Sequence, residues 1–275
     1  MMKLLEQPQA AIMGIINTTP DSFSDGGQFY ANKAAIAHGL KLIEEGADIL
    51  DIGGESTRPG AASVSVQQEL DRVLPVLEGL RKESDVVISI DTSKADVMLA
   101  AIKAGADFIN DVKALQNPNA LEAVVMSDLP VCLMHMQGEP NTMQAAPEYS
   151  NAVNDVVAFL SARITACEKQ GITRDRIVVD PGIGFGKTLE HNVQLLNALQ
   201  YIRAQLDCQV LIGVSRKSMI GGILGREVND RLYGSIGLAV QAALNGAKII
   251  RVHDVRATFD AIRCAEAVKY SRAKE

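Results

Sequence analysis

The sequence is poor in tryptophan and cysteine, with no tryptophan and only four cysteines among its 275 residues. The cysteines are Cys132, Cys167, Cys208 and Cys264, and no two of them have the CxxC or zinc-ligand spacing of a metal site. A chain of this length can bury a core without cross-links, so a disulfide framework is not expected. We therefore expect reduced thiols and a reducing compartment, the cytoplasm.

Long apolar runs and an excess of positive charge are missing as well. No apolar run approaches the roughly 18 residues of a membrane span, and Glu6 and Pro8 interrupt the stretch where a signal peptide would need an apolar core. Lysine and arginine number 27 against 33 acidic residues, a net charge of −6, whereas nucleic-acid binders usually show a basic patch. We expect a protein that binds neither membranes nor nucleic acid.

The chain does contain a repeated alternation of short apolar runs with longer stretches of helical periodicity. The eight runs expected to be strands are 11–16, 47–52, 86–90, 107–110, 130–134, 177–180, 209–213 and 248–252. Eight such units predict a closed (β/α)8 TIM barrel, and without a linker-like segment we expect one domain over residues 1–275. An open doubly wound sheet is the alternative, because continuous apolar strands fit both; the count and the length favour the barrel.

Unusual polar residues follow the expected strands on one side only. Motifs such as DTSK (91–94) come directly after a strand, whereas helix-to-strand connections such as EEGAD (44–48) are mostly short. In a barrel the carboxyl ends of all strands meet at one mouth, where enzymes of this architecture carry their active sites. We therefore expect the functional site there.

Three polar residues end separate expected strands, namely Asp91, Asn110 and Asp180. Each taken alone is equally consistent with a helix cap or an Asx-turn. Together they would converge on one mouth, where carboxylates accept hydrogen bonds and an amide both donates and accepts them. This set suits a flat heterocycle that is rich in N–H groups.

Two loops suggest contacts to such a ligand. DPGIGFGK (180–187) lacks the GxxxxGK[ST] spacing of a nucleotide phosphate loop, so an NTPase is excluded. Its glycines would instead let backbone approach a planar ligand, with Phe185 lining the slot. SRKS (215–218) precedes an expected helix, whose free N–H groups suit a carboxylate or phosphate; a solvated basic turn is the alternative.

The last expected strand, IIRVHDV (249–255), raises a charge problem. Side chains alternate along a strand, so Arg251 and His253 share one face with Ile249. A buried cation without a partner is costly, so the pattern requires an anionic partner. At the end of the first strand, Asn17 can bind a hard cation through its amide oxygen, whereas His135 lacks a second histidine ligand nearby and is interpreted as structural.

Taken together, these motifs resemble the dihydropteroate synthases, in order, from about residue 11 to residue 270. The segments that carry the resemblance are MGIINTTPDSFSDGG, DIGGESTRPGA, IDTSKADV, FINDV, VCLMHMQGEP, DPGIGFGKTLEHN, GVSRKSMIG and IIRVHDV. The resemblance implies a barrel enzyme of folate biosynthesis, a transferase of a non-methyl alkyl group. It would join 6-hydroxymethyl-7,8-dihydropterin diphosphate to 4-aminobenzoate, releasing 7,8-dihydropteroate and pyrophosphate.

The resemblance also implies roles for individual residues. The positions that match pterin contacts are Asp91, Asn110, Asp180 and Lys217. The positions that match the diphosphate site are Asn17, Asp51, Arg251 and His253, with Mg²⁺ on Asn17. The positions that match the aminobenzoate pocket, where sulfonamides also bind, are Thr57, Arg58, Pro59, Phe185, Lys217 and Ser218. Members are typically homodimers.

The implied mechanism is departure of the diphosphate from the pterin methylene, followed by attack of the arylamine. The residues expected to carry catalysis are Arg251, His253, Lys217 and Asp91. Arg251 and His253, with Mg²⁺ on Asn17, would hold the leaving group and stabilise its charge, the protein would exclude water, and no general base is expected. The long loops 17–29 and 51–60 are expected to close over the site once the diphosphate is bound.

Two other functions remain open at this point. The pterin domain of a methyltetrahydrofolate-dependent methyltransferase shares the barrel and the pterin-reading acids, and a non-catalytic pterin-binding paralogue would share the fold. The segments STRPG, SRKSMIG and RVHDV favour the synthase. Because all the loop and anion-site groups are present, the non-catalytic alternative is less favoured.

Overall fold

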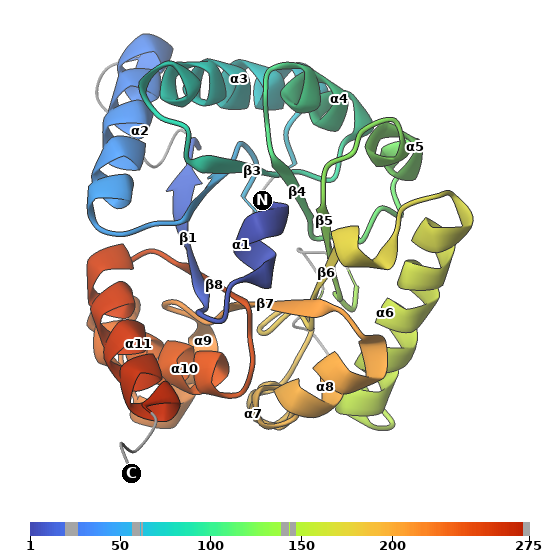
Figure 1. Cartoon of the computed structure of the whole chain (residues 1–275), viewed down its shortest axis with the longest axis vertical. Helices are drawn as coiled ribbons and strands as arrows, with labels where there is room; N and C mark the ends of the chain where they lie inside the picture. The colour runs from blue at the N-terminus through green and yellow to red at the C-terminus, as the bar shows by residue number, and fades with distance from the viewer. Residues whose placement is uncertain (20–26, 57–60, 62, 139–142, 144–146, 272–275) are drawn as a thin grey trace.

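The computed structural model describes residues 1–19, 27–56, 61, 63–138, 143 and 147–271. Within these ranges eight parallel strands close into a barrel in sequence order (Figure 1). The strands are β1 (Ala11–Asn17), β2 (Ile49–Gly53), β3 (Val87–Asp91), β4 (Phe108–Asp111), β5 (Val131–Met134), β6 (Ile177–Asp180), β7 (Gln209–Gly213) and β8 (Ile249–Val252). The predicted barrel is confirmed, every strand boundary agrees to within two residues, and the open-sheet alternative is wrong.

Helices form the outer layer of the barrel. They are α2 (Gly27–Glu44), α3 (Val66–Glu83), α4 (Ala95–Lys103), α5 (Ala120–Val125), α6 (Ala152–Lys169), α7 (Leu189–Asn197), α8 (Leu199–Leu206), α9 (Ser218–Leu224), α10 (Leu232–Leu244) and α11 (Val255–Tyr270). Two short 3-10 turns, η2 (Arg174–Arg176) and η3 (Val228–Asp230), lie between them. No helix in the described ranges is long and apolar enough to cross a membrane.

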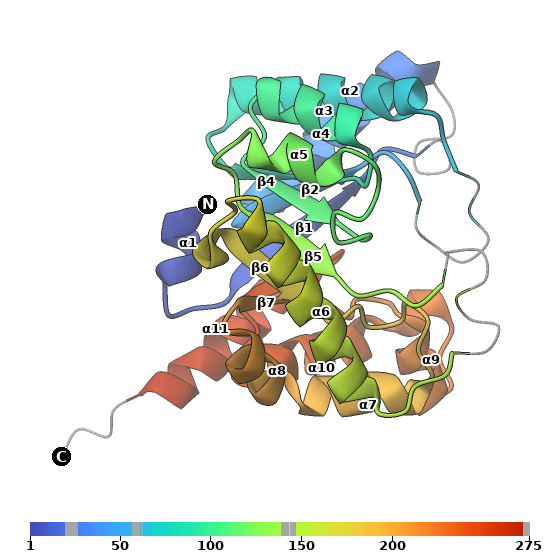
Figure 2. The ribbon, with the colours of Figure 1, turned by 90° about the vertical axis from the view of Figure 1, so that its right-hand side faces the viewer.

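The short helix α1 (Met2–Glu6) lies at the amino end of the barrel, as the side view shows (Figure 2). Its Leu5 joins an inner apolar cluster that fills this half of the barrel. The strand residues of that cluster are Ala11, Met13, Ile49, Phe108, Cys132, Val178, Leu211 and Ile249. Because apolar side chains fill the amino half, polar groups inside the barrel are confined to its carboxyl half.

Strand β8 shows how the alternation of side chains separates two cores. Ile249 belongs to the inner cluster, whereas Ile250 and Val252 belong to the larger core between the strands and the helices. Arg251 therefore shares the interior face with Ile249, as the sequence predicts. The four cysteines are free; Cys264 is exposed and the other three are buried, which agrees with the predicted thiols.

Candidate active site at the carboxyl end of the barrel

Arg251 connects three strands inside the barrel. Its Nε donates to Asp51 Oδ2 of β2 at 2.6 Å, and its Nη2 donates to Asp91 Oδ2 of β3 at 2.9 Å. Ser89 Oγ donates to the other oxygen of Asp51 at 2.5 Å, and Asn110 Nδ2 donates to Asp51 Oδ2 at 3.2 Å. Arg251 therefore has anionic partners within the protein, Asp51 and Asp91, in addition to the diphosphate that the resemblance implies, because closure of the barrel brings β2 and β3 within reach of β8.

The charges of this cluster depend on one another. Burial disfavours the charged form of Arg251, but the carboxylates of Asp51 and Asp91 raise its pKa, so the guanidinium stays charged. Burial raises the pKa of Asp91 to about 7, while Arg251 opposes this rise and Asp51 adds to it.

A second group of polar residues surrounds Lys217, which directly precedes α9. Lys217 Nζ donates to the Ile183 carbonyl and lies 4.7 Å from the centre of the Phe185 ring. Burial lowers the pKa of Lys217 to about 8, and Asp180 opposes that shift. Burial also raises the pKa of Asp180, whose Oδ1 accepts from Gly182 N at 2.7 Å. Lys217 and Asp180 are therefore close enough to interact electrostatically.

The two groups meet at Gly213, the last residue of β7. A Cβ atom at this position would lie 3.8 Å from Arg251 Cβ and 3.9 Å from Lys217 Nζ. The cluster at Arg251 and the cluster at Lys217 therefore form one continuous polar site. Two carboxylates on one side and two cations nearby can bind a ligand that is both N–H-rich and anionic.

His253 lies just beyond β8 and is held by Ser215. Its Nδ1 lies 3.0 Å from Ser215 Oγ, and its backbone N–H donates to the same oxygen at 3.2 Å. Arg216, the next residue, has a left-handed φ of 59° and pairs with Asp254 at 2.6 Å. Arg216 is therefore paired with Asp254. Ser218, the first residue of α9, directly follows Lys217.

Asn17 ends β1 and is half-buried, opposite Gly53 of β2. Among the described residues, no group of three or more acidic, histidine or cysteine side chains could hold a metal ion. Mg²⁺ commonly keeps several waters and binds one or two protein oxygens together with substrate phosphates. The amide oxygen of Asn17 suits a metal that is bound in this way, together with a diphosphate.

The predicted site residues are brought together wherever the structure describes them. The residues around Arg251 and Lys217 converge on the carboxyl end of the barrel, namely Asn17, Asp51, Asp91, Asn110, Asp180, Phe185, Lys217, Ser218, Arg251 and His253. Thr57, Arg58 and Pro59 lie outside the described residues, as do parts of the loops 17–29 and 51–60 that are expected to close.

Several polar residues of this region were not predicted. Ser89 lies two residues before Asp91, so strand alternation would have placed it on the same face. The contact between Ser215 and His253 and the contact between His135 and Lys187 were not predicted, because the partners lie far apart in the sequence. His135 agrees with its structural interpretation in being buried beneath the loop after β6.

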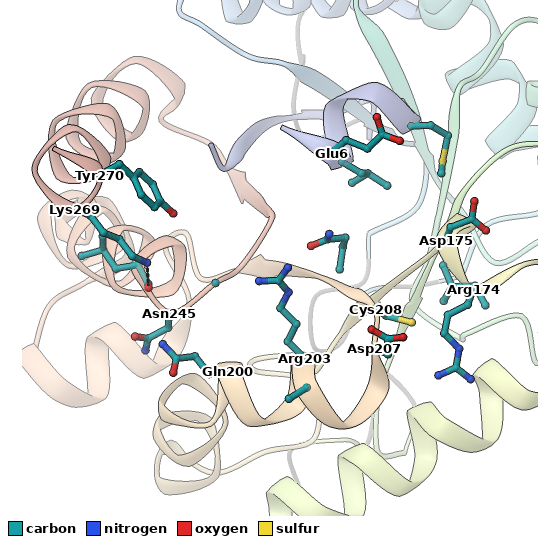
Figure 3. A pocket seen from close by; sticks show the side chains of 17 residues that line it. Glu6, Arg174, Asp175, Gln200, Arg203, Asp207, Cys208, Asn245, Lys269 and Tyr270 are labelled. Carbon is teal, nitrogen blue, oxygen red and sulfur yellow. Dashed lines mark hydrogen bonds between the residues drawn. The ribbon is translucent and has the colours of Figure 1, made fainter. Parts of the chain in front are cut away.

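A cavity of about 680 Å³ lies at the opposite, amino end of the barrel (Figure 3). Its lining includes Glu6, Arg203 and Tyr270 and none of the predicted site residues. Arg174, also in the lining, is paired with Glu168 at 2.8 Å. Acidic, basic and apolar side chains all line this cavity. The lining therefore differs from the set of polar side chains that converge at the carboxyl end.

Comparisons with known proteins give one consistent result. The family described as pterin binding enzyme matches residues 13–253. The dihydropteroate synthase of Haemophilus influenzae is 52% identical over 265 residues, which cover 96% of each chain.

Solved structures agree with this result. A Yersinia pestis dihydropteroate synthase in complex with a sulfonamide drug has a TM-score of 0.91 and 48% identity, covering 96% of this chain and 95% of that one. A Xanthomonas albilineans dihydropteroate synthase in complex with 7,8-dihydropteroate has a TM-score of 0.87 and 46% identity, covering 98% and 96%. Fold and sequence therefore both match one family.

Proposed function

The chain belongs to the dihydropteroate synthases, a family of pterin-binding enzymes, and we propose that its reaction takes place among the polar residues at the carboxyl end of the barrel. The enzyme joins 6-hydroxymethyl-7,8-dihydropterin diphosphate to 4-aminobenzoate, giving 7,8-dihydropteroate and pyrophosphate. The observation that carries the location is the continuity of the Arg251 and Lys217 clusters across Gly213. This continuity supports the proposal of one site with groups suited to a heterocycle and to an anion.

The pterin would be bound by Asp91, Asn110, Asp180 and Lys217. The carboxylates of Asp91 and Asp180 would accept from ring N–H groups, and the Asn110 amide can donate as well as accept. All three side chains are largely buried at strand ends, so they are held in place before the ligand arrives. Lys217 would border both the pterin and the aminobenzoate, because it contacts the loop that carries Phe185.

The diphosphate would be bound by Arg251 and His253, with Asn17 and Asp51 beside them. Arginine presents five N–H donors in a planar fork that suits phosphate oxygens. Nε and Nη2 of Arg251 already donate to aspartates, and among the described residues none accepts from Nη1. We infer that Asp51 and Asp91 orient the guanidinium while Nη1 donates to the leaving group.

The reaction breaks the bond between the pterin methylene carbon and a diphosphate oxygen, and forms a bond from that carbon to the arylamine nitrogen. The bonding electrons leave with the diphosphate, and the amine loses one proton to solvent. Arg251 and His253 would stabilise the developing negative charge, which is the largest contribution expected of a site like this. Mg²⁺ on Asn17, when bound, would supply further positive charge at the same leaving group.

The aminobenzoate pocket is proposed to contain Phe185, Lys217 and Ser218 together with Thr57, Arg58 and Pro59. Phe185 offers an apolar ring beside the Lys217 cation, a combination suited to an aromatic acid. The last three residues lie outside the described ranges, so their role rests on the family motif STRPG.

The direct test is release of pyrophosphate from the pterin diphosphate, measured with and without 4-aminobenzoate. We expect release that depends on both substrates and that a sulfonamide inhibits. A methyltetrahydrofolate-dependent methyltransferase or a non-catalytic paralogue would show no aminobenzoate-dependent release, and that outcome would overturn the proposal.

We further infer a homodimer in the cytoplasm, with which the free thiols agree. Large exposed apolar side chains occur on α7, α9, η3 and α10: Leu189, Val193, Ile223, Leu224, Val228 and Tyr233. Leu189 lies against Gly222 of α9, and Leu224 lies against Gly234 of α10, so the three helices share one surface, here called the α7–α10 patch. Apolar patches of this kind typically mark interaction sites.

A further inference from the structure

The loop formed by residues 181–187, which follows β6, packs backbone to backbone against the segment after β5. A Cβ atom at Gly182 would lie 1.8 Å from the His135 carbonyl oxygen, and one at Gly186 would lie 2.3 Å from the Gln137 carbonyl oxygen. Both glycines have left-handed φ angles, 70° and 61°. The loop can therefore lie this close only with glycine at these positions.

Lys187 ends this loop and is almost completely buried, with 3% of its surface exposed. Its Nζ donates back to the Phe185 carbonyl at 2.9 Å and lies 3.0 Å from His135 Nδ1. His135, also buried, contributes its carbonyl oxygen at 3.4 Å. A buried ammonium is costly unless it is bonded, so this position is built around the lysine.

The neutral form of His135 makes the pairing possible. Burial lowers the pKa of His135 to about 3, and the charge of Lys187 lowers it as well, so Nδ1 is available as an acceptor. Burial lowers the pKa of Lys187 to about 7, with Asp180 opposing and Lys217 adding to the shift. The ring of Tyr149 also faces Lys187, with its centre 6.0 Å from Nζ.

The same loop contacts the proposed active site from its other side. The Ile183 carbonyl accepts from Lys217, and the Phe185 ring lies 4.7 Å from Lys217 Nζ. Asn192 Oδ1 accepts from Gly184 N at 2.7 Å, which secures the middle of the loop. Two lysines thus bind carbonyls of one loop: Lys217 belongs to the proposed site, and Lys187 lies beneath the loop.

We propose that Lys187 and His135 form a positioning pair that sets the 181–187 loop, and through it the placement of Phe185 and Lys217 for 4-aminobenzoate. Neither member of the pair is assigned a contact with substrate. The proposal rests on the proposed roles of Phe185 and Lys217.

The test replaces Lys187 with methionine and measures KM for each substrate and kcat. Because small misplacements of binding groups commonly cost up to about a hundredfold, we expect Lys187→Met to raise KM for 4-aminobenzoate about tenfold or more. KM for the pterin diphosphate should change less than about threefold, since two of its proposed contacts, Asp91 and Asn110, lie on β3 and β4, away from this loop.

Lys248 offers a matched control at the amino end of the barrel. It is also buried, and its Nζ donates to the Gln7 and Gln9 carbonyls at 2.5 and 2.6 Å. Lys248→Met should lower the melting temperature and leave both KM values unchanged. An unchanged aminobenzoate KM in Lys187→Met, or an equal rise in Lys248→Met, would overturn the proposal.

Two further comparisons keep the test decisive if Lys187→Met folds poorly. His135→Asn retains an acceptor for Lys187, so its KM for 4-aminobenzoate should stay close to that of wild type. His135→Leu has no acceptor and should reproduce the rise in this KM. Phe185→Ala tests the underlying site separately. If Phe185→Ala leaves aminobenzoate KM unchanged, the site assignment fails; if it raises that KM while His135→Leu does not, the positioning pair fails.

Discussion

Arg251 pairs with two aspartates of the fold and, in the proposed mechanism, also stabilises the leaving group. We expect Arg251→Ala to lower kcat about 10²–10³-fold, because one well-placed electrostatic contact contributes roughly 3–4 kcal/mol to a transition state. It should also destabilise the fold by about 3–5 kcal/mol, since Asp51 and Asp91 would lose their cation. Turnover at saturating substrate and urea unfolding measure the two effects.

Arg251→Lys separates charge from geometry. It keeps the cation near Asp51 but loses the planar fork. We expect stability closer to wild type and kcat still clearly reduced. Near-normal turnover in Arg251→Ala would contradict the leaving-group role of Arg251.

His135 allows a prediction about acid stability. Its pKa is lowered to about 3 in the folded protein from an ordinary 6.5, so between these values the unfolded chain binds more protons. Stability therefore rises with pH across this window and is lost as the pH falls. The stability advantage of wild type over His135→Asn should shrink by about 3 kcal/mol between pH 6.5 and pH 4, at about 1.36 kcal/mol per pH unit. Urea unfolding at both pH values measures this, and a pH-independent difference would contradict it.

At the scale of elements, Lys94 links α3 to the loop after β2. Its Nζ donates to Glu69 Oε2 of α3 at 2.5 Å and to Glu55 Oε2 at 2.7 Å. Glu69 is fully buried, and its Oε1 has no hydrogen-bond partner among the described residues. Lys94→Met should cost about 3–5 kcal/mol of unfolding free energy, because it leaves a buried carboxylate without a cation.

The matched control for Lys94 is Lys41→Met. Lys41 pairs with Glu45 at 3.7 Å on the surface of α2, with 69% of its side chain exposed, and such pairs contribute about 0.3–0.5 kcal/mol. Adding Glu69→Gln to Lys94→Met should recover much of the loss. Equal costs for Lys94→Met and Lys41→Met would show that the buried link does not stabilise α3.

The elements also show why the sequence predicted some contacts and not others. Alternation along β8 depends only on neighbouring residues, so the shared face of Ile249 and Arg251 followed from the sequence. The ion pair of Arg251 with Asp51 joins residues 200 positions apart and exists only because the barrel closes. Lys187 ends the motif DPGIGFGK, but its partner His135 is 52 positions away in the sequence. Periodicity carries no information on such a pairing.

On the scale of the whole molecule, the barrel is apolar in its amino half and charged at its carboxyl end. This polarity would confine the proposed reaction to one end of the barrel. The α7–α10 patch lies close to this end as well, because Leu189 and Tyr233 are in the first turns of α7 and α10 and α9 begins at Ser218. Tyr233 within the patch has 83% of its surface exposed. A tyrosine with so much apolar area in water favours association through this patch.

The corresponding prediction concerns mass in solution. Wild type should sediment at twice the 29.5 kDa of one chain, whereas the double variant Ile223→Glu/Tyr233→Glu should sediment as a monomer, because two carboxylates would have to be buried at the contact. Met126→Glu is the control, since Met126 is equally exposed, at 83%, at the end of α5 and outside the patch. A monomeric wild type would refute the homodimer, and dissociation by Met126→Glu would move the interface to α5.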